Sequence, residues 1–347
     1  MVSKGRIIAP RTTHATIYWF PYFYLNANIR AECCMTIVMR TMKTVAAWLK
    51  GWSAEPTRAK SMVMTIFCDV VYPHGGHVSL GSLVEAGGLV GISEQALRSA
   101  VNRLVAEGWL ISEAQGRRSI FSFSETGRLR ATIPLGRVYQ SFDLPWAGQW
   151  NIVIAKNWRL DQEIYLQATK DLLWAGYGRV SDNVFIRPII GGDITPCCPG
   201  SILAKEVVCF VGSEKQCPLN GDIDDLISRA WDMSTIADRY AAFKERYSPV
   251  LASLTKNPSM RSAEAFALRL CMLHDLRRIR IMDPQLPLNL LPKGWKGIKA
   301  LDLARQIYQA LLPLSEHYIT EFMNGPSGSM PAAEKSFYER FGGLSPA

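Results

Sequence analysis

Apolar side chains recur at helical spacing in three successive segments between residues 58 and 108. Pro73 and the glycines that follow it predict the end of the first segment, and the pair Gly87-Gly88 is expected to break the second. The third begins after Ser93, whose hydroxyl can cap a helix. Apolar positions up to Phe123 then predict two strands around a turn. Three helices followed by a hairpin are typical of a winged helix-turn-helix.

The pattern changes after residue 137, where short apolar runs alternate with helical stretches. Strand, helix, two strands and helix follow one another in residues 138–256, which predicts a small α/β sandwich of the ferredoxin-like type. Residues 257–323 are expected to form a helical domain. The segment 324–347 contains NGPSGSMP and predicts a disordered tail. We therefore expect an α+β protein with a winged helix-turn-helix in residues 58–137, a ferredoxin-like middle domain and a C-terminal helical domain.

Residues 1–57 are expected to form an extension outside these domains. The stretch Thr16–Ile29 is apolar and aromatic, but it is shorter than the ~20 residues of a spanning helix. It also lacks the small-residue cleavage pattern of a signal peptide. Two alternatives stay open for this extension: it is disordered, or translation starts at a later methionine. The candidate starts are Met35, Met39 and Met42.

The net charge of +9 permits a polyanionic partner such as nucleic acid. Residues 1–57 carry seven Lys or Arg against two Asp or Glu, and residues 58–137 carry nine against six, so the excess lies in the first 137 residues. None of the eight cysteines forms a CxxC pair or the regular spacing of a zinc site. We expect reduced thiols and no metal.

The third helical segment carries polar side chains outside its apolar face. They are Gln95, Arg98, Ser99, Asn102 and Arg103. Arginine can pair with guanine, and asparagine or glutamine with adenine, so such a helix suits the major groove of DNA. Arg117, Arg118 and Ser119 at the hairpin would reach an adjacent groove or phosphate. The alternative is a solvated helix face and a solvated turn.

Several segments, in order, resemble the phenylacetic acid degradation operon repressors, or PaaX-like regulators. They are MTIFCDVVYPHGG, ISEQALRSAVNRLVAEGWL, GRRSIFSFSETGR, WAGQWNIVIA, LLWAGYGRVSDNVFIRP, RAWDMSTIADRYAAF, LHDLRRIRIMDPQLPLNLLPKGWKG and ARQIYQALLP. The resemblance covers roughly residues 58–315. It implies a repressor of an aromatic-acid catabolic operon with a winged helix, a Cas2-like middle domain and a helical C-terminal domain. It also implies release from DNA by a CoA thioester, typically phenylacetyl-CoA. Gln95 and Asn102 stand where the family has a basic and an aromatic residue.

An acyl-CoA needs arginines for its phosphates and an apolar aromatic pocket for its acyl group. The candidate walls are Trp146, Trp150, Trp174, Tyr177 and Trp295, and the candidate phosphate contacts are Arg187, Arg277 and Arg278. Core packing is the alternative for each tryptophan.

An enzyme is the competing class, in particular a metal-dependent nuclease on the Cas2-like domain. The segment Trp150–Asn157 has no carboxylate to hold such a metal, and the chain has no phosphate loop, dinucleotide fingerprint or HExxH motif. We expect a cytoplasmic, non-enzymatic homodimer on operator DNA that uses no cofactor. A DNA-binding regulator without a small-molecule effector also stays open.

Overall fold

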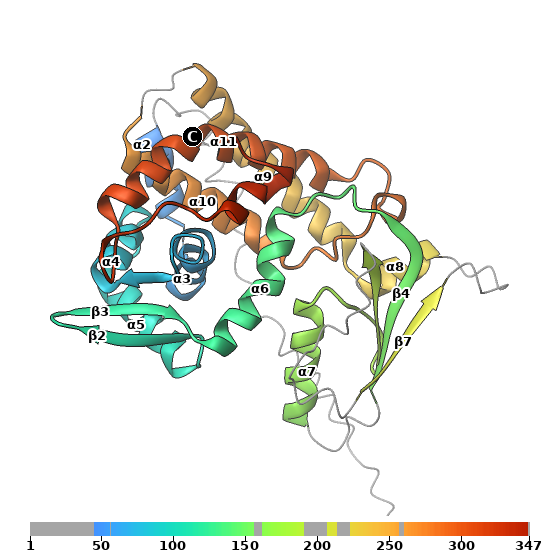
Figure 1. Ribbon diagram of the computed structural model, residues 1–347. Coiled ribbons are helices and arrows are strands. Elements are labelled where there is room, and N and C mark those ends of the chain that lie inside the picture. The colour runs from blue at the N-terminus through green and yellow to red at the C-terminus, as the bar shows by residue number, and fades with distance from the viewer. Residues whose placement is uncertain are drawn as a thin grey trace, which may run out of the picture. The chain divides into compact units, whose positions relative to one another are not determined.

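The computed structural model describes residues 45–55, 57–155, 162–190, 207–213, 223–256 and 260–345, all within one unit of the chain, residues 42–347. It is a mixed structure of helices and small antiparallel sheets, as an α+β class requires (Figure 1). No described helix combines the length and apolar character needed to cross a bilayer.

Three helices and a three-stranded sheet form the N-terminal part of this unit. They are α3 (Ala59–Ile66), which continues as the π-helical turn η1 (Phe67–Val71), α4 (Leu80–Leu89), α5 (Glu94–Ala106), β1 (His77–Ser79), β2 (Leu110–Gln115) and β3 (Arg118–Phe123). The strands pair antiparallel in the order β1-β3-β2. Ser79 and Ser93 cap α4 and α5, because each hydroxyl accepts a bond from a backbone N–H in the first turn.

The expectation that Gly87-Gly88 breaks the second helix is wrong, because α4 runs on to Leu89. Gly87 has a packing reason instead. A Cβ at this position would lie 2.3 Å from Cδ1 of Leu97 on α5, whereas a Cβ at Gly88 would meet nothing within 4 Å. Gly87 therefore lets α4 and α5 approach closely.

A 15-residue helix, α6 (Glu125–Tyr139), leads from the first sheet to a second one. That sheet has the order β5-β6-β4-β7, with every neighbouring pair antiparallel. Its elements are β4 (Trp146–Ala155), β5 (Gly178–Ser181), β6 (Val184–Ile190), β7 (Val207–Ser213) and the helix α7 (Gln162–Trp174). The central position of β4 and β6 agrees with a ferredoxin-like sheet. This assignment stays an interpretation, because residues 191–206 lie outside the described part.

The two faces of this sheet belong to two different cores. Val153 and Phe185 pack with residues of α7, while Trp150, Ile152 and Ile186 pack into the larger core shared with the C-terminal helices. Successive residues of a strand point to opposite faces, so this division follows from the strands themselves.

Four helices form the C-terminal part: α8 (Ile223–Ala230), α9 (Met233–Lys256), α10 (Ser262–Arg280) and α11 (Lys296–Phe322), with the short turn η4 (Leu288–Leu290). Helix α9 packs on α11 and α10 (Figure 1). The expected boundary between residues 256 and 257 is therefore wrong, because α9 joins the C-terminal helices and not the second sheet.

Both ends of the described chain also depart from expectation. Helix α2 (Val45–Ser53) buries Trp48 and Trp52, and the Trp52 indole donates to Asp275 on α10 at 3.0 Å. Residues 45–55 thus belong to the folded unit, whereas residues 1–44 lie outside the described part. The tail is not disordered over 324–345 either. It forms β8 (Asn324–Gly325), β9 (Gly328–Ser329) and η5 (Lys335–Gly342), and the apolar side chains that anchor it are Phe337, Phe341 and Leu344.

Candidate nucleic-acid interface

Helix α5 presents every polar side chain singled out from the sequence to solvent. The Ser93 hydroxyl accepts from the Ala96 N–H at 3.3 Å, which sets the start of the helix. The side chains buried on its inner face are Leu97, Ala100, Val101 and Leu104. The exposed row consists of Gln95, Arg98, Ser99, Asn102 and Arg103. Since the inner face is fixed against α3 and α4, the outer row is held in one orientation.

Arg98 is held by a neighbour on its own helix. Its Nε lies 2.7 Å from Oε1 of Glu94, and both side chains are about half exposed. An exposed pair at this spacing contributes only about 0–1 kcal/mol. Arg98 can therefore leave Glu94 for a phosphate or a base edge at little cost.

The hairpin β2–β3 lies directly after α5, which contacts β2 (Figure 1). Gln115 pairs with Arg118, so Gly116 and Arg117 form a two-residue turn. Gly116 has φ +58°, a conformation that suits glycine at the first central position of such a turn. Arg117, Arg118 and Ser119 are exposed, whereas Ile120 and Phe121 anchor the base of β3 in the core.

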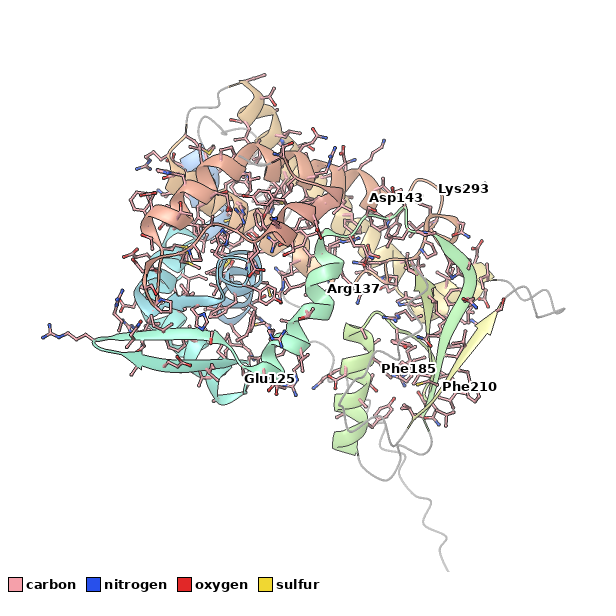
Figure 2. All side chains as sticks on the ribbon, viewed as in Figure 1. Glu125, Arg137, Asp143, Phe185, Phe210 and Lys293 are labelled. Atoms are coloured by element: carbon pink, nitrogen blue, oxygen red, sulfur yellow. The ribbon has the colours of Figure 1, made fainter. Side chains whose placement is uncertain are left out.

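Further arginines extend along α6 but do not all reach solvent. Arg128 and Arg130 are exposed, and the Arg130 guanidinium lies 5.7 Å from the Trp109 ring centroid. Arg137 is buried and donates to the Asp283 carbonyl, so it is a structural residue (Figure 2). The basic surface therefore ends before the last turn of α6.

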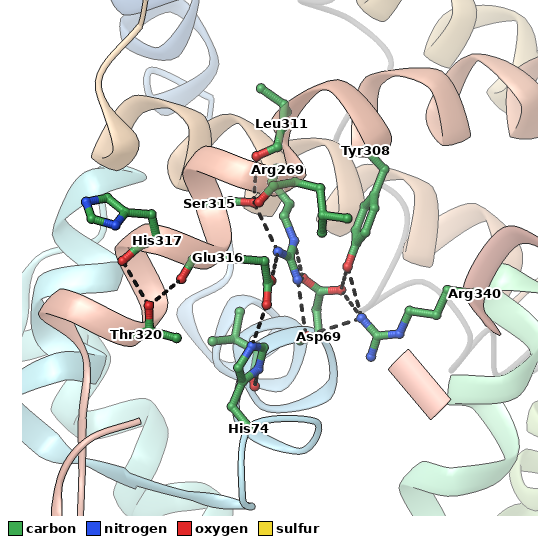
Figure 3. A network of polar contacts seen from close by, with 12 residues as sticks. Asp69, His74, Arg269, Tyr308, Leu311, Ser315, Glu316, His317, Thr320 and Arg340 are labelled. Atoms are coloured by element: carbon green, nitrogen blue, oxygen red, sulfur yellow. Dashed lines mark hydrogen bonds and ion pairs between the residues drawn. The ribbon is translucent and has the colours of Figure 1, made fainter. Parts of the chain in front are cut away.

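A buried ionic network joins η1 to the C-terminal helices and the tail (Figure 3). Asp69 accepts bonds from Arg269 Nε at 3.0 Å, from Arg340 Nη1 at 2.7 Å and from the hydroxyls of Tyr139 and Tyr308. Arg269 Nη1 also donates to Glu316 at 2.6 Å. Glu316 also meets Nε2 of His74 at 2.9 Å, so two carboxylates face two guanidinium groups and an imidazole.

This network was not predicted, although one residue of the sequence indicates it. Asp69 interrupts the apolar run Val63–Val71, and a carboxylate is almost never fully buried without a partner. The sequence signal could have pointed to a buried pair, but not to Arg269 and Arg340, which lie 200 and 271 residues further along the chain.

A second buried cluster fixes the C-terminal end of α6. Arg280 donates to the carbonyls of Arg137, Val138 and Gln140, which lie in the last turn of α6 and just beyond it. The last carbonyls of a helix lack partners within the helix, and an arginine can satisfy them. Arg280 also lies 3.4 Å from Asp283, so its charge is paired. Three arginines lie in the last turn of α10. Arg277 and Arg278 were the candidate phosphate contacts, whereas the buried Arg280 was not a candidate.

The candidate effector residues whose side chains are described lie in different parts of the structure. Trp146 and Trp150 stack edge to face at 5.4 Å, with Trp150 in the larger core. Tyr177 and Arg187 meet on the opposite face of the sheet, with the guanidinium 5.2 Å from the ring centroid. Trp150 and Tyr177 therefore lie on opposite faces of the sheet, and the effector site stays a prediction.

The other candidates lie elsewhere. Trp295 packs on Tyr240 at 5.9 Å, as the core-packing alternative requires. Arg277 is half-buried and Arg278 is exposed, both near the end of α10. The side chain of Trp174 lies outside the described residues. Within the described part of the chain, no three His, Cys, Asp or Glu side chains converge as metal ligands would.

Comparison with known proteins places two regions of the chain. The family model described as PaaX-like protein matches residues 58–127, and the model described as PaaX-like protein C-terminal domain matches residues 231–321. The chain is 28% identical over 297 residues to the transcriptional repressor PaaX of Escherichia coli (strain K12), covering 84% of this chain and 92% of that protein. Among solved structures, the uncharacterized protein Rv0674 from Mycobacterium tuberculosis matches with a TM-score of 0.44 and 20% identity, over 74% of this chain and 96% of that one.

Proposed function

Because this chain is a PaaX-like protein in both of its matched regions, we propose that it is a DNA-binding transcriptional repressor. The observation that carries the proposal is the exposed polar row of α5 beside an arginine-tipped hairpin, both within residues 58–127. In this proposal α5 is the recognition helix of a winged helix-turn-helix, and the hairpin β2–β3 is the wing.

The division of work between the two elements follows from their side chains. Gln95, Asn102 and the arginines of α5 can form two hydrogen bonds each with base edges, so they supply sequence selectivity. Arg117 and Arg118 at the turn supply affinity, because phosphate neutralisation dominates it. The repressor works as a homodimer, since a two-fold protein matches a palindromic operator.

The resemblance to the PaaX-like regulators extends the proposal to the regulated pathway and its signal. The operon encodes the breakdown of an aromatic acid of the phenylacetate type, and the effector is an aryl-acyl-CoA such as phenylacetyl-CoA. The thioester binds the body of the protein and favours a state whose recognition helices no longer match the operator. A ligand with equal affinity for both states would not release DNA.

The test is a gel shift on DNA from upstream of the gene's own neighbourhood, with and without phenylacetyl-CoA. A complex that dissociates with the thioester, but not with free phenylacetate or free CoA, supports the repressor and its effector together. A complex that ignores the thioester keeps DNA binding and contradicts this effector. Absence of any complex contradicts the proposed function.

Arginine variants locate the interface. We expect the double change Arg117→Ala and Arg118→Ala to abolish operator binding at ~0.15 M salt and to lower the salt dependence by about 0.9 per lost phosphate contact. Arg98→Ala should also abolish operator binding and leave the fold intact. The matched control is Arg305→Ala, which removes an exposed arginine from α11. Wild-type binding by the first two proteins would show that α5 and the hairpin do not contact DNA.

A further inference from the structure

Among the described residues, three polar side-chain atoms of α7 and the second sheet are buried without a hydrogen-bond partner. They are Nδ2 of Asn151 on β4, Oγ1 of Thr169 on α7 and Nε of Arg187 on β6. Asn151 and Thr169 are only 2% and 7% exposed. A buried donor without an acceptor destabilises a protein by about 1–3 kcal/mol, so such groups call for an explanation.

The three side chains belong to the same layer of the structure. Asn151 and Arg187 are directly paired across β4 and β6. By strand alternation both point to the face of Val153 and Phe185, which α7 covers (Figure 2). Thr169 follows Ala168, whose side chain belongs to the same small core.

Within the described part of the chain, the contacts of Arg187 are to a carbonyl and an aromatic ring and not to an acid. Its Nη1 donates to the Ala175 carbonyl at 3.3 Å, and its guanidinium lies over the Tyr177 ring. Among the described residues, no carboxylate pairs with it. The Nε edge is therefore available, and Asn151 adds a second donor from the neighbouring strand.

We propose that Asn151, Thr169 and Arg187 bind the carboxyl group of a small organic acid, or the carbonyl oxygen of its thioester. Two donors and one positive charge select an oxygen acceptor with negative character. The planar guanidinium edge matches a planar carboxyl group. The side chains around the site are apolar, so a dianion such as phosphate would lose more hydration than a carboxylate on entering.

This proposal deepens the effector part of the proposed function, and the choice of an aromatic acid as probe rests on it. The role proposed here for Arg187 differs from the one expected from the sequence. Here the arginine binds the acyl end of the ligand, whereas the sequence suggested that it binds the phosphates of CoA. Tyr177 would then cover the guanidinium, since a cation over an aromatic face is stabilised there.

The test is isothermal titration calorimetry of the full-length protein without DNA. The probes are sodium phenylacetate, phenylacetyl-CoA, free CoA and inorganic phosphate. We expect saturable binding of phenylacetate, of phenylacetyl-CoA or of both. The titrations that show binding identify whether the site takes the free acid or the thioester. Binding of free CoA or phosphate as tight as that of both acyl probes would overturn the carboxyl assignment, and so would the lack of any binding.

Variants test the three residues. Asn151→Leu and Arg187→Met each remove a bond to the bound acceptor and should weaken binding by at least about tenfold. Thr169→Val keeps the side-chain shape and should weaken it less. The control is Arg179→Met, which removes an exposed arginine of β5 from its pair with Asp182 and should bind like the wild type. Wild-type affinity in the first two variants would refute the site.

Melting temperatures separate a ligand site from a buried-water site. With the ligand absent, Asn151→Leu and Thr169→Val remove unpartnered polar atoms, so the melting temperature should stay the same or rise. If a structural water joins these groups instead, both variants should melt at a lower temperature, and the proposal fails. Because these assays contain no DNA, ligand binding can fail here while the gel shift still shows a DNA complex, and the reverse, so the two failures are distinguishable.

Discussion

Arg340 should tie the C-terminal segment to the N-terminal helices, and the change Arg340→Met tests this. Its guanidinium donates to Asp69 at 2.7 Å and to the Tyr308 hydroxyl at 3.0 Å, and it lies 4.4 Å from the Tyr139 ring centroid. Methionine keeps most of the apolar contact but removes the charge. Asp69 would then keep one arginine in place of two.

The expected loss of stability follows from these contacts. Removing one partner of a buried ion pair typically destabilises a protein by about 3–5 kcal/mol. We expect the lower end, about 3 kcal/mol, because Asp69 keeps Arg269 and two tyrosine hydroxyls. At a slope of about 2 kcal/mol per molar urea, the unfolding midpoint should fall by about 1.5 M.

The measurement is urea unfolding followed by circular dichroism. Arg305→Met is the matched control, because Arg305 forms an exposed pair with Asp302 at 3.7 Å. Such a pair contributes about 0–1 kcal/mol, so the control should unfold like the wild type. If Arg340→Met unfolds within about 0.5 kcal/mol of the control, the buried network does not hold the C-terminal segment in place.

Two further changes test packing and pH dependence. Gly87→Ala should destabilise the protein by about 1–3 kcal/mol through overpacking against Leu97, whereas Gly88→Ala should be neutral or stabilise it by about 0.5–1 kcal/mol, and thermal unfolding compares the two. Equal melting temperatures would contradict the close approach of α4 and α5. Burial, opposed by Asp275, lowers the pKa of His274 to about 4, so the folded protein keeps this ring neutral. The stability that His274 contributes is fully present above the unfolded pKa of about 6.5 and is lost as the pH falls toward 4. Between pH 7 and 4.5 the free energy of unfolding should fall by about 2–3 kcal/mol. Urea unfolding at these two pH values should show a smaller loss in His274→Gln, and an equal loss would show that another group titrates.

Local patterns in the sequence were enough for the elements that matter most to the proposed interface. The cap at Ser93 and the apolar spacing after it predict α5, and the polar residues outside that spacing are all exposed. The apolar positions up to Phe123 predict β2 and β3. These features depend on neighbours within a few residues, and the same segments carry the resemblance to the PaaX-like regulators.

Other elements escaped prediction because their local signal is weak. Strand β1 has three residues and exists through its pairing with β3. The tail has a composition typical of disorder, but Phe337, Phe341 and Arg340 attach it to helices formed by distant parts of the chain. Gly87 looks like a helix breaker until Leu97 is seen beside it.

The amino-acid sequence alone thus determined helix α5, the hairpin and the family likeness, because each rests on short-range spacing and on motifs that can be read directly. Only the tertiary structure decided which charges are surface and which are structural. Arg117 and Arg118 are exposed. Arg269 and Arg280 are buried and Arg340 is largely buried, each against carboxylates or carbonyls. It also separated Trp150 from Tyr177 and brought Asn151, Thr169 and Arg187 into one layer. Burial and pairing depend on segments far apart in the chain, and no local pattern contains that information.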